Sequence, residues 1–252
     1  GFDVNAYYPS HPDRVVIRKN KFLDSSLLEK DILTYYDKVK RLMIPFFKNR
    51  DVAIQIFADG NKTILKRHVS PKEKKYIEIR SIADFDKFNT GRAVAFYIGE
   101  RTKNNYAIID TDPGEGVNFI TIKKLTVEVG NALNELDMFE DIDYLFTGKR
   151  GFHIWAWLKR SRDIDDIREG LEEFLNDYFK DSDKITITKK PRKGQVRMDI
   201  SINKEAGLHI CPLSLRFETG LVSWWVPEKK LMEFEKTNYT IERILKKVKK
   251  GG

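Results

Sequence analysis

The order of strand and helix patterns after residue 105 constrains the fold of this chain more than any other feature. Apolar runs of strand length are separated by two stretches in which apolar residues recur with helical spacing. The order strand, helix, strand, strand, helix, strand, strand favours helices packed on a mainly antiparallel sheet, which is the α+β class. The expected strands are 106–112, 143–147, 152–158, 184–188 and 196–203, and the expected helices are about 119–137 and 163–179.

The segment before residue 105 predicts a helix followed by a hairpin. Residues 25–47 have helical apolar spacing, with Ser26 as the N-cap and Glu29 as its capping-box partner. Two further strands are predicted around the turn at Asp59 and Gly60. Because no repeat or low-complexity linker marks a boundary, we expect a single catalytic domain over residues 1–252. Its parts are an N-terminal lobe, a catalytic sheet and a C-terminal extension, at 1–104, 105–226 and 227–252.

Composition excludes several classes of protein. The single cysteine, Cys211, excludes a disulfide framework and a cysteine-rich zinc module, and it suits a reducing compartment. The longest apolar runs are too short to span a bilayer, and no signal peptide is visible. We therefore expect a cytoplasmic protein that binds no zinc and contacts no membrane.

The charge of the chain favours a polyanionic partner. Lysine and arginine outnumber aspartate and glutamate by 46 to 38, which gives a net charge of +8. Residues 188–197, "TKKPRKGQVR", are rich in basic side chains and contain no acid. We predict a nucleic-acid contact in this loop, with Lys189, Arg192 and Lys193 among its DNA-binding residues.

Two acids stand at the end of the segment "YAIIDTDPGEG". Alternate residues of a strand share a face and lie roughly 6 to 7 Å apart, so Asp110 and Asp112 point the same way. A divalent cation between them would relieve their repulsion. Asp199 lies on the polar face of the predicted strand 196–203. If this strand lies beside 106–112, three carboxylates converge, which is typical of a site for two divalent metals.

A glycine turn between two predicted strands adds groups that bind phosphate. The segment "TGKRGFH" contains the Thr147 hydroxyl, the cations of Lys149 and Arg150, exposed backbone amides and the His153 imidazole. Its glycines let the backbone approach an anion closely. This set of groups is suited to holding a triphosphate.

In this order, the motifs resemble those of the archaeo-eukaryotic primase superfamily. They are D-x-D at Asp110 and Asp112, the glycine turn ending in His153, and Asp199 on a later strand. Within the superfamily, the chain is most similar to the polymerase domain of the bacterial end-joining ligase D and to its free-standing archaeal relatives. Segments that support this resemblance run from "HPDRV" at residue 11 to "PLSLR", which ends at residue 216.

The resemblance implies a template-directed nucleotidyltransferase whose fold is related to RNA-recognition modules. Such an enzyme uses Mn²⁺ or Mg²⁺ and adds NTPs or dNTPs to a primer end during non-homologous end joining. The implied partners are DNA, a separate ligase and a Ku-type end-binding protein. The residues implied are Asp110, Asp112 and Asp199 for catalysis and metal binding, Lys66, Thr147, Arg150, His153 and Arg216 for the nucleotide, and Arg14, Lys30, Lys149, Lys189, Arg192 and Lys193 for DNA.

The N-terminal phosphate-binding positions depart from the pattern of the family. The family recognises a 5′-phosphate with two N-terminal lysines, and the matching positions here are Arg14 and Glu29. A glutamate cannot bind a phosphate, so this recognition depends on whether Lys30 substitutes for it.

Three other functions compete with this interpretation. A replicative-type primase catalytic subunit shares the motifs, but it commonly carries the zinc module that a single cysteine excludes. A haloacid-dehalogenase-like phosphatase would use Asp110 as nucleophile and Asp112 as general acid, but its later Gly-Asp motif does not occur in this chain. A non-catalytic nucleic-acid-binding protein would lose affinity for phosphate by keeping three acids in its groove.

Overall fold

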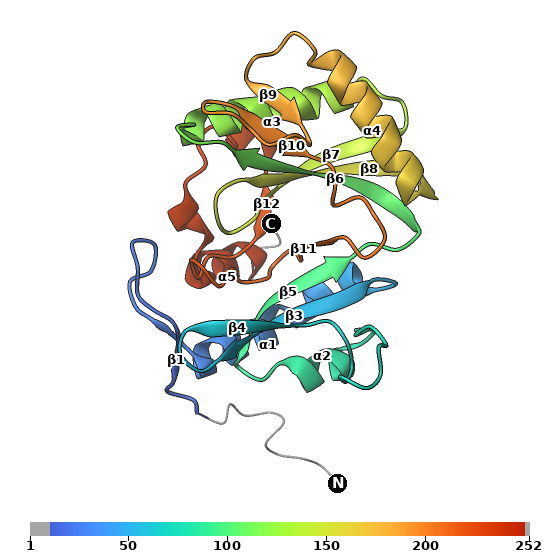
Figure 1. Cartoon of the computed structure of the whole chain (residues 1–252). Coiled ribbons are helices and arrows are strands. Elements are labelled where there is room, and N and C mark those ends of the chain that lie inside the picture. The colour runs from blue at the N-terminus through green and yellow to red at the C-terminus, as the bar shows by residue number, and fades with distance from the viewer. Residues whose placement is uncertain (1–10, 250–252) are drawn as a thin grey trace. The chain divides into compact units, whose positions relative to one another are not determined.

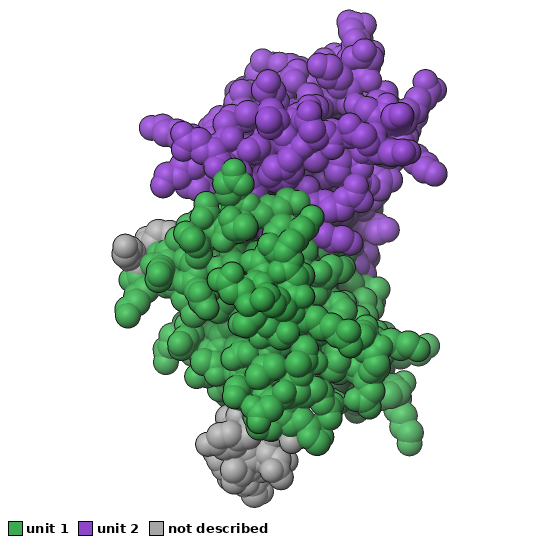
Figure 2. All heavy atoms as spheres, turned by 90° about the vertical axis from the view of Figure 1, so that its left-hand side faces the viewer, with its two compact units in different colours: residues 1–99, 208–224, 235–252 green, residues 100–207, 225–234 purple. Residues whose placement is uncertain are grey.

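The computed structural model describes residues 11–249, which form two compact units (Figure 2). The described part of unit 1 comprises residues 11–99, 208–224 and 235–249, and unit 2 comprises residues 100–207 and 225–234. The chain therefore leaves unit 1, builds most of unit 2, and returns to unit 1 twice. Neither unit is continuous in sequence.

Unit 1 contains a sheet with the strand order β11-β5-β3-β4, packed with helices α1 and α2 (Figure 1). An aromatic cluster in which Tyr36, Phe85 and Phe96 contact one another fills its core. The predicted hairpin is confirmed, because β3 and β4 pair in antiparallel fashion around Gly60. The elements are β1 (Val15–Ile17), β2 (Leu27–Leu28), α1 (Glu29–Phe47), β3 (Asp51–Ala58), β4 (Lys62–Lys66), α2 (Ile82–Phe88), β5 (Ala93–Gly99), β11 (Leu208–Ile210), η3 (Lys236–Tyr239) and α5 (Ile241–Lys249).

Helix α1 begins two residues later than the prediction, and its cap uses another acid. The backbone N–H of Leu28 donates to Oδ2 of Asp31 at 2.8 Å, so Asp31 supplies the carboxylate of the capping box. Ser26 instead accepts a hydrogen bond from the N–H of Lys19. The assignment of Ser26 and Glu29 to the cap was wrong. Glu29 and Asp31 both lie in the first turn of the helix, and the spacing from Ser26 favoured Glu29.

Unit 2 contains a sheet with the strand order β12-β7-β8-β6-β10-β9. Strand β9 pairs in parallel with β10, and the β10–β6, β6–β8 and β7–β8 pairs are antiparallel. Helices α3 and α4 cover one face of this sheet (Figure 1). The expected α+β class with a mainly antiparallel sheet is confirmed. The elements are β6 (Lys103–Pro113), α3 (Phe119–Leu133), β7 (Phe139–Phe146), β8 (Phe152–Asp163), α4 (Ile164–Tyr178), β9 (Ile185–Ile187), β10 (Val196–Asp199), β12 (Trp224–Val226) and η2 (Glu228–Lys230).

Strand β10 is shorter than predicted. It ends at Asp199, and the residues that continue its apolar alternation belong to a turn. In this turn the Asn203 amide donates to the carbonyls of Ile108 and Ile200 and accepts from the N–H of Ile108. The alternation misled because burial in the turn does not follow it: Asn203 is buried although it is polar, whereas Ile202 is only half-buried.

The segment 225–234 is tied to helix α3 by a buried lysine. The Nζ of Lys123 donates to the backbone carbonyls of Met232 at 2.9 Å and Phe234 at 3.3 Å, and only 6% of the residue is exposed. No helix in residues 11–249 combines the length and the hydropathy that crossing a bilayer requires.

Candidate active site

The register of three neighbouring strands gathers the predicted acids on one face of the sheet. Asp199 on β10 lies opposite Asp110 on β6, and Arg197 lies opposite Asp112. On the other side of β6, His153 of β8 is also opposite Asp110. Because paired residues and alternate residues share a face, all five side chains lie on the same side.

This polar face is the one turned away from helix α3. Phe152 precedes His153 on β8, and its ring stacks on Phe119 of α3 with centroids 5.7 Å apart. Since successive side chains of a strand alternate between faces, His153 and the three acids lie on the opposite side of the sheet.

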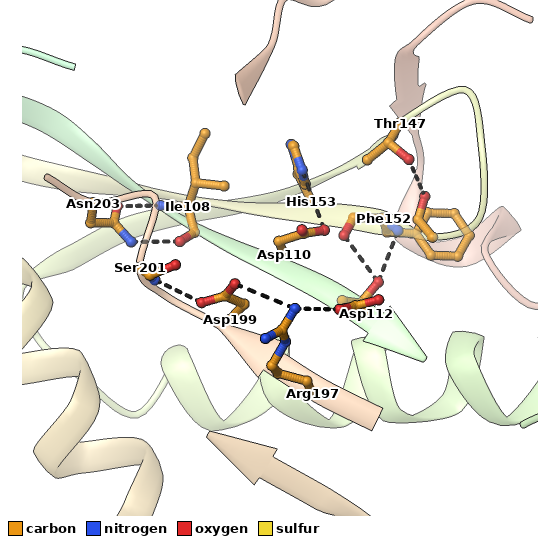
Figure 3. Close-up of polar contacts among 12 residues, drawn as sticks. Ile108, Asp110, Asp112, Thr147, Phe152, His153, Arg197, Asp199, Ser201 and Asn203 are labelled. Atoms are coloured by element: carbon orange, nitrogen blue, oxygen red, sulfur yellow. Dashed lines mark hydrogen bonds and ion pairs between the residues drawn. The ribbon is translucent and has the colours of Figure 1, made fainter. Parts of the chain in front are cut away.

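An arginine joins two of the carboxylates (Figure 3). The Nη2 of Arg197 donates to Oδ2 of Asp112 at 2.5 Å and lies 4.0 Å from Oδ2 of Asp199. The Nε2 of His153 lies 3.4 Å from Oδ1 of Asp110. The side chains of Asp110 and Asp112 are each 35% exposed, whereas that of Asp199 is 15% exposed. The face is therefore a partly open carboxylate cluster that contains its own cation.

The donor chemistry of the three aspartates fits a hard divalent ion such as Mg²⁺ or Mn²⁺, which prefers carboxylate oxygens. Their arrangement differs from that of a formed site. Within residues 11–249, no group of three or more histidine, cysteine, aspartate or glutamate side chains is placed to hold a metal ion. Between Asp112 and Asp199, the guanidinium of Arg197 is bound instead.

The glycine turn is fixed directly beside this cluster. The hydroxyl and the N–H of Thr147 both donate to the carbonyl of Gly151, at 3.0 and 3.2 Å. The hydroxyl of Thr111 on β6 donates to the carbonyl of Phe152 and accepts from its N–H. A Cβ at Gly151 would lie 2.5 Å from the carbonyl oxygen of Thr111, so only glycine allows this approach. Thr147 therefore closes the turn, and Arg150 at its tip is exposed.

The basic loop packs against the acidic turn. The N–H of Gly114 donates to the carbonyl of Gln195 at 2.7 Å, and a Cβ at Gly114 would lie 2.7 Å from the carbonyl oxygens of Arg192 and Gln195. The predicted DNA contacts Lys189, Arg192 and Lys193 are exposed on this loop. Between turn and loop is an open pocket of about 530 Å³, lined by Asp112, Gly114, Glu115, Lys190, Pro191, Lys193 and Arg197.

The other predicted ligands belong to unit 1. The guanidinium of Arg14 pairs with Glu29 and Asp59, both at 3.4 Å, and the Nζ of Lys30 lies 2.8 Å from Asp13. The remaining two are Lys66, whose Nζ lies over the Phe88 ring, and Arg216, whose Nε lies 3.5 Å from Oε2 of Glu218. Both cations near the position expected for a 5′-phosphate, Arg14 and Lys30, thus have acidic partners within the unit.

Sequence patterns did not identify the roles of Arg197 and Asn203. The alternation of 196–203 placed both on the polar face, but only the register shows which residues of β6 they meet. Asn203 bonds the backbone of Ile108, two residues before Asp110, and so fixes the turn that follows Asp199. The signal available in the sequence was an asparagine at the end of an alternating segment.

Comparisons with known proteins agree with this fold. The family model for the LigD primase-polymerase domain matches residues 87–252. The multifunctional non-homologous end joining protein LigD of Mycolicibacterium smegmatis is 22% identical over 234 residues, which cover 82% of this chain and 30% of the relative. The polymerase domain of Mycobacterium tuberculosis ligase D, solved in complex with DNA, superposes with a TM-score of 0.82 at 16% identity, covering 97% of this chain and 94% of the other.

The fold, the carboxylate face and the glycine turn define a primase-polymerase, an enzyme of the nucleotidyltransferase class. The chain belongs to the LigD primase-polymerase domain family. The predicted resemblance is confirmed, and the chain spans 30% of the length of its mycobacterial relative.

Proposed function

We propose that this domain is a template-directed DNA repair polymerase that adds NTPs or dNTPs to a primer end during non-homologous end joining. The observation that carries the proposal is the strand register, which sets Asp199 and His153 on either side of Asp110 and places Asp112 on the same face. Membership in the LigD primase-polymerase family supports the polymerase chemistry.

The proposed roles follow from the positions of the side chains. Asp110, Asp112 and Asp199 would hold Mg²⁺ or Mn²⁺, which would neutralise the triphosphate and lower the pKa of the primer 3′-hydroxyl. His153 is buried beside Asp110, and Arg150 extends from the tip of the adjacent turn. These two side chains would bind and orient the triphosphate, with the turn at Thr147 setting their positions. From unit 1, Lys66 and Arg216 are proposed as further nucleotide ligands.

DNA is the proposed macromolecular partner. The exposed cations of the basic loop, Lys189, Arg192 and Lys193, would contact the backbone of the primer and template, together with Lys149 of the turn. The solved neighbour from Mycobacterium tuberculosis was captured in complex with DNA. In end joining, the domain would act beside a ligase and a Ku-type end-binding protein, whether on the same chain or on others.

Primer extension tests this proposal. A labelled primer on a template is incubated with NTPs or dNTPs and with Mn²⁺ or Mg²⁺. We expect metal-dependent extension by the wild-type protein and a fall of at least about a hundredfold in Asp199→Ala, because a metal ligand is lost. Glu172→Ala removes an exposed carboxylate of α4 in the same unit and serves as the matched control.

Other products would point to other functions. Extension by Asp199→Ala at the wild-type rate would contradict the proposed site. Products formed from template and NTPs without a primer would identify a replicative-type primase. Release of phosphate without extension would favour the phosphatase, and DNA binding without any reaction would favour a passive binder.

A further inference from the structure

The positive charge of Arg197 lies between two carboxylates of the cluster, those of Asp112 and Asp199. Arg197 lies directly opposite Asp112 across the β6–β10 pair, and Asp199 is two residues further along its own strand. The guanidinium contacts Asp112 at 2.5 Å and approaches Asp199 to 4.0 Å (Figure 3). The two carboxylates are thus linked through one side chain.

A guanidinium and a divalent ion compete for the same carboxylate oxygens. Arginine keeps its charge at any physiological pH, so it neutralises the cluster whenever it is bound there. A bound Mg²⁺ requires carboxylate oxygens at about 2.0 to 2.1 Å. Oδ2 of Asp112 is already used by a short, charge-assisted hydrogen bond. A metal ion that takes Oδ2 of Asp112 and Oδ2 of Asp199 therefore competes with Arg197 for these oxygens.

The surroundings of Arg197 give it room to withdraw. Its side chain is 30% exposed and lines the open pocket of about 530 Å³ beside the basic loop. The wall of this pocket includes Glu115, a carboxylate outside the cluster. Among residues 11–249 the buried Nε of Arg197 finds no hydrogen-bond partner, so one end of the guanidinium holds the side chain in place.

We propose that Arg197 is a positioning residue that occupies the carboxylate cluster in the metal-free protein and is displaced when a divalent ion binds. The guanidinium holds Asp112 and Asp199 in place and raises the metal concentration needed for binding. This inference rests on the proposed function, because it takes the three aspartates as the metal ligands.

The test is a titration with Mn²⁺ in the absence of nucleotide and DNA. The electron paramagnetic resonance signal of the free ion gives the Kd for Mn²⁺. In Arg197→Gln, which removes the charge and keeps hydrogen-bonding groups, we expect the Kd for Mn²⁺ to fall roughly tenfold, because a charge-assisted bond no longer competes. Arg197→Lys, with a weaker and less directional cation, should give an intermediate value. A purely structural role for Arg197 predicts the opposite sign, because a damaged site binds metal more weakly.

Thermal melting of the same proteins supplies a second readout. Without metal, Arg197→Gln should melt below the wild type, because the carboxylates have lost their counterion. Saturating Mn²⁺ should raise its melting temperature by more than that of the wild type. Arg160→Gln removes an exposed cation at the far end of β8 and should leave both measurements unchanged.

The outcomes separate this inference from the proposed function. An equal or higher Kd in folded Arg197→Gln overturns the role of Arg197, and so does the absence of Mn²⁺ binding in every variant. Primer extension by the wild type would still support the polymerase in either case. If the wild type extends no primer, the polymerase proposal fails, and the Mn²⁺ titration still decides whether Arg197 competes with metal.

Discussion

Glu29 is a buried carboxylate that pairs with Arg14, an environment that its place in the sequence did not suggest. It occupies a position where the family has a phosphate-binding lysine, and it was predicted to cap a helix. Its side chain is instead fully buried, with the guanidinium of Arg14 at 3.4 Å. Burial raises the pKa of the Glu29 carboxyl above its ordinary value of 4.5, and the charges of Arg14 and Arg92 offset only part of this effect.

This raised pKa predicts that Glu29→Gln stabilises the protein at neutral pH. The folded state keeps a proton on Glu29 at a higher pH than the unfolded chain does. The proton therefore contributes its full stabilisation of the folded state below pH 4.5. It is lost as the pH rises through the folded pKa. The amide resembles the protonated acid and avoids this loss, so we expect a gain in the free energy of unfolding at pH 7.

Urea unfolding at pH 4 and pH 7 measures this difference. The gain should be present at pH 7 and small at pH 4, and Glu172→Gln on the exposed face of α4 should change little at either pH. A loss of stability at pH 7 would mean that the ion pair with Arg14 outweighs the cost of burial.

At the scale of elements, the contact between the glycine turn and β6 is the most sterically restricted part of the site. Gly151→Ala would bring a Cβ to 2.5 Å from the carbonyl oxygen of Thr111, so the turn must move away from the strand. We expect a loss of about 1 to 3 kcal/mol in the free energy of unfolding. The affinity for the incoming nucleotide should also fall, because Arg150 and His153 lie on and beside this turn.

Gly170→Ala is the matched control for this substitution. Gly170 lies inside helix α4, and a Cβ there would meet no atom within 4 Å. The same change in side chain should stabilise the helix by about 0.5 to 1 kcal/mol. Equal stability changes in the two variants would show that the turn is not restricted by Thr111.

Sequence patterns predicted the elements better than the way they pair. Hydrophobic periodicity identified the hairpin at Gly60, the helices after Asn118 and Asp163, and the strand that contains Asp110, because these signals are local. The parallel pairing of β9 with β10 and the ion pair of Arg197 with Asp112 both depend on strand register, and the ion pair joins residues 85 positions apart. No local pattern encodes that register, so the acids were predicted and their counterion was not.

At the scale of the whole molecule, the net charge of +8 predicts salt-dependent DNA binding. The logarithm of the affinity should fall linearly with the logarithm of the salt concentration. Arg192→Gln should reduce the slope by about one and weaken primer binding, because one phosphate contact is lost. Fluorescence anisotropy with a labelled primer-template measures both effects.

The affinity for the incoming nucleotide should change little in Arg192→Gln, since Arg192 is exposed on the loop and outside the carboxylate cluster. An unchanged salt slope in this variant would place Arg192 outside the DNA interface. Arg160→Gln supplies the comparison, because it removes the same charge from an exposed position elsewhere in unit 2.

The interleaving of the two units has a consequence for synthesis on the ribosome. Strand β5 ends at Gly99, and β11, which pairs with its free edge, begins only at Leu208. At about 5 to 20 residues per second, that edge stays unpaired for roughly 5 to 20 s while unit 2 is translated. An exposed strand edge is a template for wrong pairing. The nascent chain is therefore most vulnerable to aggregation in this interval, when the first unit lacks both its last strand and the buried residues that follow it.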